Sequence, residues 1–382
     1  MSVKAEMVGI TNHFATLTDP RVARTRCHDL IDILVVAVCG TICGCDSWED
    51  LVRYGKSKRK WLRKFIRLRN GIPSADTFAR VFQRLNPDEF VRCMSSWVDS
   101  LRVNVTDEIV AIDGKTSRGS GNASKGGRPL HLVRAWACEN RLVLGQQACE
   151  EKSNEITAIP KLLELIELSG AIVTIDAMGC QTEIVEKIRE RGADYVLPVK
   201  DNQPGLREKI ARIFETELER EAEGGRPKFR QHATHEQRHG RIEDRRYYVL
   251  SAPEELKAGR RWKDIRSLGM IIRRRIIDGK ETLEVHYYIS SLAPNARRFA
   301  RAVRAHWGIE NKLHWMLDVN FADDASQIHK GSSPQIAAML RDLALMILQH
   351  DTQFKESIRG KRKMAGWSNE ALESILRQST TI

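Results

Sequence analysis

Residues 171–199 read AIVTIDAMGCQTEIVEKIRERGADYVLPV, and this stretch decides the fold class. Two β-rich apolar runs, AIVTIDA and ADYVLPV, lie on either side of QTEIVEKIRERG, in which apolar residues recur three and four positions apart before Gly192. A strand, a helix and a second strand in that order pack as two parallel strands joined by a right-handed crossover. The stretch therefore predicts an α/β fold.

Three further β-rich runs come before this unit: EIVAIDGKTSR from Glu108, LHLVRAWACEN from Leu130 and RLVLGQQACEE from Arg141. Turn-forming residues separate them, so we expect three consecutive antiparallel strands. The helix-like segment ITAIPKLLELIELSG, which ends at Gly170, links them to the parallel unit. Antiparallel strands followed by alternating helices and strands are typical of a ribonuclease H-like mixed sheet with flanking helices.

Composition and periodicity divide the 382 residues into five parts. Residues 1–105 have helical periodicity, and 106–224 contain the first part of the predicted core. Residues 225–293 begin as an Arg- and His-rich stretch without apolar periodicity and then contain three β-like runs, which predict a β-rich insertion. Residues 294–350 return to helical periodicity and would complete the core, and 351–382 form a basic helical region.

The chain is strongly basic, with 62 Lys and Arg residues against 50 Asp and Glu and a formal net charge of +12. Such a balance is expected of a protein that binds a polyanion. In the helical N-terminal region, nine basic residues between Arg53 and Arg69 alternate with Trp61 and Phe65. This pattern is compatible with DNA contact, and equally with a solvated cationic face over an aromatic anchor.

No apolar run is long enough to span a bilayer, and no apolar secretory signal is visible, so we expect a cytoplasmic protein with no membrane partner. Eight cysteines lie mostly inside apolar patterns. The spacing of Cys39, Cys43 and Cys45 raises the alternative of zinc, but it matches no common ligand knuckle. We expect reduced thiols that pack in the core.

Two aspartates end apolar runs at equivalent places, Asp113 after EIVAI and Asp176 after AIVTI. Sites in such sheets form at strand ends, so neighbouring first and fourth strands would bring the two carboxylates together. Paired carboxylates repel each other unless a divalent cation neutralises them, and Mg²⁺ or Mn²⁺ prefers oxygen ligands. Taken alone, each aspartate could instead be a helix N-cap or a turn residue.

The segment HWGIENKLHWMLD places four potential ligands four residues apart: His306, Glu310, His314 and Asp318. That spacing puts them on one helical face, from which Glu310 could complete a metal site at the strand ends. We expect Trp307, Leu313 and Leu317 to pack this helix on the sheet.

Other metal ligands were weighed for the same region. His306 and His314 could hold zinc, although the residue order of zinc proteases is absent. Asp323 and Asp324 could be extra ligands or solvated loop charges.

Several of these stretches closely resemble bacterial insertion-sequence transposases of the DDE type, in the subfamily of H-repeat-associated proteins. The motifs are IDGKTSRGS, the long stretch from NEITAIP to PVKDNQP, HGRIEDR and HWGIENKLHWMLDVNFADD, and the likeness runs from Asp19 to KRKMAGW at Lys361. The resemblance implies a ribonuclease H-like catalytic core with a β-rich insertion before its last catalytic helix. It also implies a metal-binding catalytic triad of Asp113, Asp176 and Glu310.

The implied chemistry uses Mg²⁺ or Mn²⁺ held by these three acids to cut element ends and to join the 3′-hydroxyl to target DNA by phosphoryl transfer. The implied partners are element-end and target DNA, with a homodimer or larger assembly on that DNA in a prokaryotic, nucleoid-associated setting. The candidate DNA contacts are Lys115, Arg118, Lys200, Asn202, Gln203, His306 and His314. Two alternatives stay open: a Mg²⁺-dependent nuclease without strand joining, and a catalytically inactive or domesticated DNA-binding protein.

Overall fold

The computed structural model describes residues 10–121, 127–150, 154–238, 240–259 and 261–378. The first nine residues of the predicted N-terminal region and the last four of the predicted C-terminal region lie outside this part of the chain. So do five residues of the turn predicted between the first two strands. No helix in the described ranges is both long and apolar enough to cross a membrane.

The core is built on a mixed sheet whose first five strands have the spatial order β3-β2-β1-β4-β5. β1 pairs antiparallel with β2, and β2 with β3, whereas β1 and β4 are parallel, as are β4 and β5. This arrangement confirms the predicted α/β class and the mixed sheet. The strands are β1 (Ile109–Ser117), β2 (Leu130–Ala137), β3 (Leu142–Ala148), β4 (Ile172–Ile175) and β5 (Asp194–Val199).

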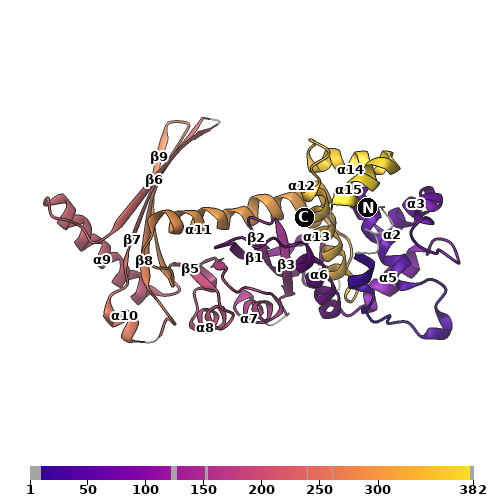
Figure 1. Ribbon diagram of the computed structural model, residues 1–382, viewed down its shortest axis with the longest axis horizontal. Helices are drawn as coiled ribbons and strands as arrows, with labels where there is room; N and C mark the ends of the chain where they lie inside the picture. Colours follow the sequence, from indigo (N-terminus) through magenta and orange to yellow (C-terminus); the bar gives the residue numbers. More distant parts are fainter. Residues whose placement is uncertain (1–9, 122–126, 151–153, 239, 260, 379–382) are drawn as a thin grey trace.

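The middle strands are covered on both faces, and this explains their unbroken apolar runs. All four residues of β4 are buried, as expected of a parallel strand between layers of helices. Figure 1 shows α7 (Glu155–Leu165) and α8 (Thr182–Glu190) below the sheet and α11 (Ala296–Ile309) above it. Only the ends of these strands are therefore left to carry a site.

The β-rich insertion continues the central sheet. It follows α9 (Pro204–Ala222), and its last strand, β9, pairs antiparallel with β5. Beyond β9 the order is β8, β7 and β6, which makes a nine-stranded sheet. In Figure 1 these four strands project past α11, and we call them the arm. They are β6 (Arg230–Arg238), β7 (Arg241–Ser251), β8 (Ser267–Ile277) and β9 (Lys280–Ser290), with α10 (Glu254–Ala258) between β7 and β8.

Helices from both ends of the chain pack together at the side of the molecule opposite the arm (Figure 1). Nε1 of Trp61 donates a hydrogen bond to Oε1 of Glu373 at 2.6 Å, and Nζ of Lys58 donates to Oδ1 of Asn369 at 2.9 Å. Trp61 is buried and is thus the aromatic anchor under the basic stretch. The helices are α2 (Leu30–Ile42), α3 (Trp48–Ser57), α4 (Arg59–Leu62), α5 (Ala75–Arg84), α6 (Pro87–Leu101), α13 (Ser333–His350), α14 (Ile358–Trp367) and α15 (Asn369–Gln378).

The three clustered cysteines pack in this helical unit. Cys39 is buried, and Cys43 and Cys45 are partly buried, all as free thiols. Burial raises the pKa of Cys43 and of Cys45 to about 12. Both thiols therefore stay protonated at neutral pH, as expected of core residues.

Candidate active site

The register between β1 and β4 brings two aspartates together. Ile112 pairs with Ile175 in the parallel ladder, and Asp113 and Asp176 are the next residues along the chain. The two residues are therefore neighbours at the edge where β4 ends, although β1 itself continues to Ser117. Asp176 also caps the short 3-10 helix that follows it, because its Oδ1 accepts a hydrogen bond from the backbone N–H of Gly179 at 3.2 Å. Asp176 is therefore both a helix N-cap and a neighbour of Asp113 in the strand register.

Glu310 approaches this edge from the helix above the sheet. α11 ends at Ile309 and continues as a π-helical turn, Glu310–His314, before α12 (Trp315–Phe321). Such turns occur often at functional sites. Glu310 is exposed, but partial desolvation of its carboxyl group raises its pKa, and the negative charge of Asp113 raises it further. The predicted helix therefore carries its glutamate to within electrostatic reach of Asp113.

Asp176 lies between two other acidic groups. Burial raises its pKa, and the negative charges of Glu155 and Asp113 add to that effect. We call the carboxyl groups of Glu155, Asp176, Asp113 and Glu310 the acidic row, because Asp176 is within electrostatic reach of Glu155 and Asp113, and Glu310 of Asp113. In the described part of the chain, histidines are their only ion-pair partners, at Glu155 and Asp113. The row is therefore a concentration of negative charge without a Lys or Arg partner.

The acidic row fits a divalent cation in donor chemistry. Its donors are all carboxylate oxygens, which Mg²⁺ and Mn²⁺ prefer, and an ion would relieve the repulsion that raises two of the pKa values. Ligands of one Mg²⁺ lie about 2.1 Å from it and hence within about 4.2 Å of one another. Asp113, Asp176 and Glu310, all within the described ranges, do not form a group whose ligand atoms all lie within 4.8 Å. As placed, the three side chains are therefore wider apart than the ligands of a single Mg²⁺.

Two histidines of the Glu310 helix lie beside Asp113. Nδ1 of His314 is 3.4 Å from Oδ2 of Asp113, and His314 is only 9% exposed. Its Nε2 is buried and has no hydrogen-bond partner among the residues that the structure describes. Nδ1 of His306 lies 3.1 Å from Oγ1 of Thr174 on β4, and burial lowers the pKa of His306. Neither histidine belongs to a compact group of three candidate ligands within the described ranges, so the zinc alternative gains no support.

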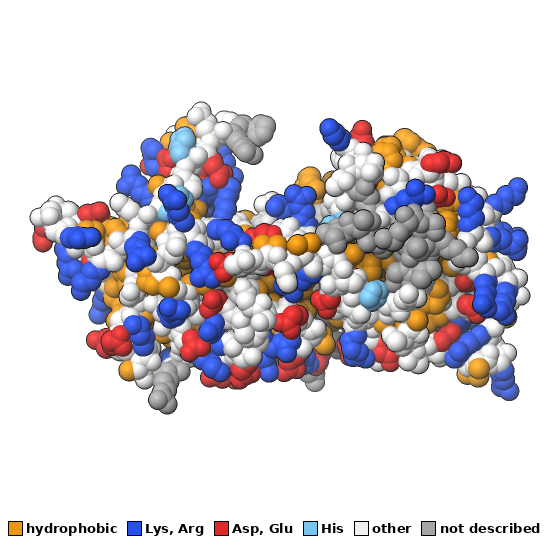
Figure 2. Space-filling model, in the orientation of Figure 1, with side chains coloured by type: hydrophobic (Ala, Val, Ile, Leu, Met, Phe, Trp, Pro, Cys, Tyr) orange, Lys and Arg blue, Asp and Glu red, His pale blue; other side chains and the backbone are white. Residues whose placement is uncertain are grey.

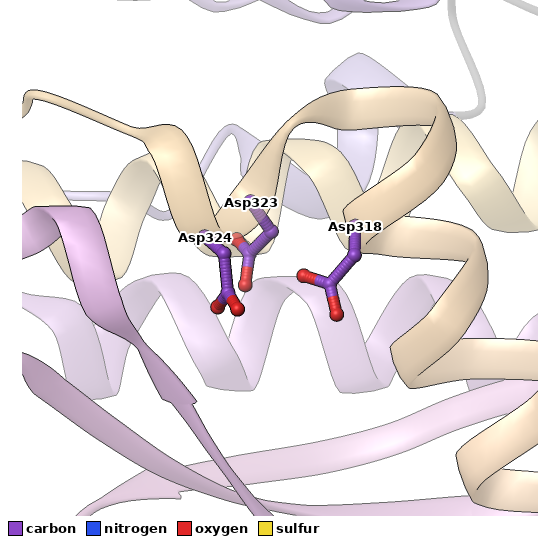
Figure 3. Close-up of side chains that lie close together, drawn as sticks. All are labelled: Asp318, Asp323 and Asp324. Carbon is purple, nitrogen blue, oxygen red and sulfur yellow. The ribbon is translucent and has the colours of Figure 1, made fainter.

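A second acidic cluster lies just beyond α12, where Asp318, Asp323 and Asp324 offer ligand atoms within 4.8 Å of one another. Figure 3 shows their side chains around a common space at the end of α12. Nζ of Lys115, from β1, lies 2.7 Å from Oδ1 of Asp318, 2.9 Å from Oδ1 of Asp324 and 3.5 Å from Oδ2 of Asp323. A protein cation therefore holds this cluster together, and we call these four residues the clamp.

The clamp shows how Asp323 is held and why the Glu310 helix lies against β1. Asp323 is 1% exposed, and its Oδ1 forms an ion pair with Nη2 of Arg341 at 2.7 Å, so it is not a solvated loop charge. Burial alone would raise its pKa, but the positive charges of Arg341, Arg134 and Lys115 lower it. Because Lys115 lies on the strand of Asp113 and Asp318 on the helix of Glu310, the clamp fixes that helix to that strand.

Besides the two histidines, the candidate DNA contacts are three basic side chains and two amides, and only some of them are free to reach DNA. Lys115 is 9% exposed and its ammonium group is engaged by the clamp. Arg118 and Lys200 are exposed, and the Arg118 guanidinium lies 3.5 Å from Asp324. The two amides instead brace the turn after Asp176: Nδ2 of Asn202 donates to the carbonyl of Ala177 at 2.6 Å, and Nε2 of Gln203 donates to that of Cys180 at 3.1 Å.

The sequence did not point to Glu155 or to the histidine that contacts it, His131. Glu155 begins α7, and its Oε1 is 2.8 Å from Nε2 of His131 on β2. Nδ1 of His131 is in turn 2.7 Å from Oγ1 of Thr116. An acidic residue in the first turn of a helix is ordinary, so only the glycine at Gly114, against which Glu155 packs, could have signalled its position.

Comparison with known proteins places the chain in a family. A family model described as "Transposase DDE domain" matches residues 105–347, and one described as "DDE_Tnp_1-associated" matches residues 11–98. The chain is 36% identical over 376 residues to the "H repeat-associated putative transposase YhhI" of Escherichia coli K12, covering 97% of this chain and 98% of the relative. It is 37% identical over 371 residues to the "Putative transposase YncI" of Escherichia coli O157:H7, covering 96% and 94%. This chain therefore belongs to the DDE transposase family, among relatives that include the H repeat-associated proteins.

Proposed function

We propose that the protein is an insertion-sequence transposase that cuts DNA at element ends and joins the freed 3′-hydroxyl to target DNA. The observation that supports this proposal is the β1–β4 register, which makes Asp113 on β1 a neighbour of Asp176 just past the end of β4, with Glu310 within electrostatic reach of Asp113. The strand order β3-β2-β1-β4-β5 supports a ribonuclease H-like core as part of the same proposal. Membership of the family supports the reaction class.

The acidic row supplies the chemistry in this proposal. Asp113, Asp176 and Glu310 would hold Mg²⁺ or Mn²⁺. Bound there, the ions would stabilise negative charge on the phosphodiester and make the attacking water or hydroxyl more acidic. The turn after Asp176, braced by Asn202 and Gln203, keeps that carboxylate at the strand end.

The DNA would lie in the hollow between the arm and the helices at the opposite end, which Figure 2 shows on the upper side of the molecule. α11 runs along the floor of this hollow (Figure 1) and leads into Glu310. Trp307 and Trp315 are 43% and 56% exposed on either side of Glu310. Exposed aromatic rings can stack on unpaired bases. Arg118, Lys200, His306 and His314 remain proposed contacts.

The proposal is tested with linear DNA that carries the ends of the element encoding this chain, in the presence of Mg²⁺ or Mn²⁺. We expect strand cuts at the ends and joined products with a second DNA. Asp113→Asn, Asp176→Asn and Glu310→Gln should each lower cleavage by more than about a hundredfold, because losing even an outer-shell metal partner costs 10–100-fold. DNA binding should persist in all three variants.

The outcomes separate the proposal from its alternatives. Cuts without joined products would make the protein a nuclease, and binding without cuts by the wild type would make it an inactive DNA-binding protein. The proposed homodimer or larger assembly is tested by measuring the mass of the complex on end DNA. A single copy per DNA pair in active complexes would contradict it.

A further inference from the structure

We propose that Glu155 is a fourth carboxylate of the active site and a ligand for a divalent cation on the Asp176 side of the acidic row. This inference deepens the proposed function and rests on it. Neither a sequence motif nor the family comparison assigned a role to this residue.

The carboxylate of Glu155 is held in one position. Its Oε1 is 2.8 Å from Nε2 of His131, and Nδ1 of the same ring is 2.7 Å from Oγ1 of Thr116. His131 and Thr116 are cross-strand partners in the β1–β2 pair. A neutral ring that accepts from the Thr116 hydroxyl and donates to Glu155 satisfies both contacts. Within the described residues Oε2 makes no hydrogen bond, so it is available for a ligand.

The residue next to Asp113 must be a glycine for Glu155 to lie where it does. A Cβ atom on Gly114 would lie 2.1 Å from Oε1 of Glu155 and 2.7 Å from Nε2 of His131. Any side chain there would displace the carboxylate. Glu155 therefore packs directly on the backbone that carries Asp113, a placement that an ordinary helix-terminal acid does not require.

The charge distribution around Glu155 also calls for a cation. The helix that Glu155 begins packs against the short 3-10 helix that Asp176 caps. The carboxylates of Glu155, Asp176 and Asp113 have no Lys or Arg partner among the described residues. Their mutual repulsion costs free energy unless a cation compensates their charge. Beside Asp113, Nε2 of His314 is buried and has no hydrogen-bond partner among the described residues, while its Nδ1 faces the aspartate.

Ions can reach Glu155 from solvent. An open cleft of about 460 Å³ is lined by Glu155, Asn154 and His131 on one side and by Met178, His329 and Gln335 among others. Met178 belongs to the turn that Asp176 caps. The cleft therefore opens Glu155 and the turn that follows Asp176 to the outside of the molecule.

Binding of Mn²⁺ alone to the full chain, measured by calorimetry and by the electron paramagnetic resonance signal of free Mn²⁺, tests the inference. We expect Glu155→Gln to weaken Mn²⁺ binding by about tenfold or more. Glu164→Gln, which makes the same chemical change at an exposed position of α7 paired with Lys187, should leave the affinity unchanged. The increase in melting temperature that Mn²⁺ gives the wild type should shrink in Glu155→Gln and not in Glu164→Gln.

Asp176→Asn distinguishes the failure of this inference from that of the proposed function. If Asp176→Asn loses Mn²⁺ and Glu155→Gln does not, Glu155 only orients α7 and the inference is overturned while the proposed site stands. If both variants bind Mn²⁺ like the wild type, the metal site itself is refuted. Should Glu155→Gln not fold, His131→Phe carries the test, since it leaves the charge of Glu155 but frees its orientation. Wild-type affinity in His131→Phe would then overturn the inference.

Discussion

The clamp and the acidic row both gather carboxylates around β1 and the helix that carries Glu310 and Asp318, but their charges are compensated differently. In the clamp, Lys115 contacts three carboxylates and Arg341 a fourth oxygen, and the pKa of Asp323 is lowered. In the row, no lysine or arginine within the described ranges pairs with a carboxylate, and desolvation together with neighbouring negative charge raises the pKa of Asp176 and of Glu310. Carboxylate clusters thus become structural or ligand-binding according to whether the protein supplies the cation.

The largest expected effect is the loss of the clamp's own cation. Lys115→Met should lower the free energy of unfolding by about 3–5 kcal/mol, because removing one partner leaves buried charges uncompensated. Denaturant unfolding measures this change. Lys312→Met, at an exposed position of the π-helical turn, is the control and should stay within about 0.5 kcal/mol. Equal stability of Lys115→Met and wild type would show that the ammonium group does not hold the clamp.

The acidic row should respond to an external cation where the clamp does not. Mn²⁺ at a hundred times its dissociation constant should stabilise the wild type by about 2.7 kcal/mol, and EDTA should reverse the effect. Asp176→Asn should lose this stabilisation, because it removes a ligand of the row. An equal gain in the wild type and in Asp176→Asn would place the bound ion elsewhere in the molecule.

Asp→Asn changes in the two clusters should alter metal-free stability in opposite directions. Asp176→Asn should raise the free energy of unfolding by about 0.5–2 kcal/mol, the usual gain from relieving a functional site. Asp323→Asn should lower it, because Arg341 would lose its charged partner. Unfolding free energies at pH 7 in EDTA measure both changes, and a change of the same sign in both variants would contradict the comparison.

The pH dependence of these differences follows from the directions of the pKa shifts. The raised pKa of Asp176 costs the wild type stability as pH rises through that pKa, so the advantage of Asp176→Asn should shrink as pH falls toward the ordinary value of 3.8. The lowered pKa of Asp323 contributes stability above its unfolded value, and this contribution is lost as pH falls through the folded pKa. A pH-independent advantage of Asp176→Asn would rule out relief of charge as its cause.

The smallest expected effect is at the turn that positions Asp176. Asn202→Ala removes one hydrogen bond to the carbonyl of Ala177 and should lower the free energy of unfolding by about 1 kcal/mol. It should also weaken Mn²⁺ binding slightly, since the turn holds Asp176. Asp201→Ala, which changes the exposed neighbour, serves as the control for both measurements.

The sequence was most informative where burial dictated residue choice. The apolar runs of β1 and β4 revealed two strands covered on both faces, and the residue that follows each run is one of the two aspartates. It was least informative in the arm, where β6 (RQHATHEQR) contains no large apolar residue and was not predicted as a strand. Cross-strand pairs hold it instead, including His235 with Asp244 and Arg245 with Glu236.

The Glu310 helix shows a second limit of sequence patterns. A spacing of four assumes a regular α-helix, and the π-helical turn at Glu310–His314 changes which side chains share a face. Leu313 and Leu317 are buried as predicted, but Trp307 is 43% exposed, and the guanidinium of Arg273 lies over its ring at 5.8 Å. Contacts between elements far apart in the chain, such as Glu155 with Gly114, leave no periodic signal.

The continuity between the arm and the core has a mechanical consequence. β5 is hydrogen-bonded to β9 on one side and to β4 on the other, and β4 leads directly into Asp176. A twist applied to the arm is therefore passed through backbone ladders to the strand end, without an intervening hinge loop. We therefore expect the arm to move together with the core sheet, so that a load on the arm would change the geometry of the carboxylates two strands away.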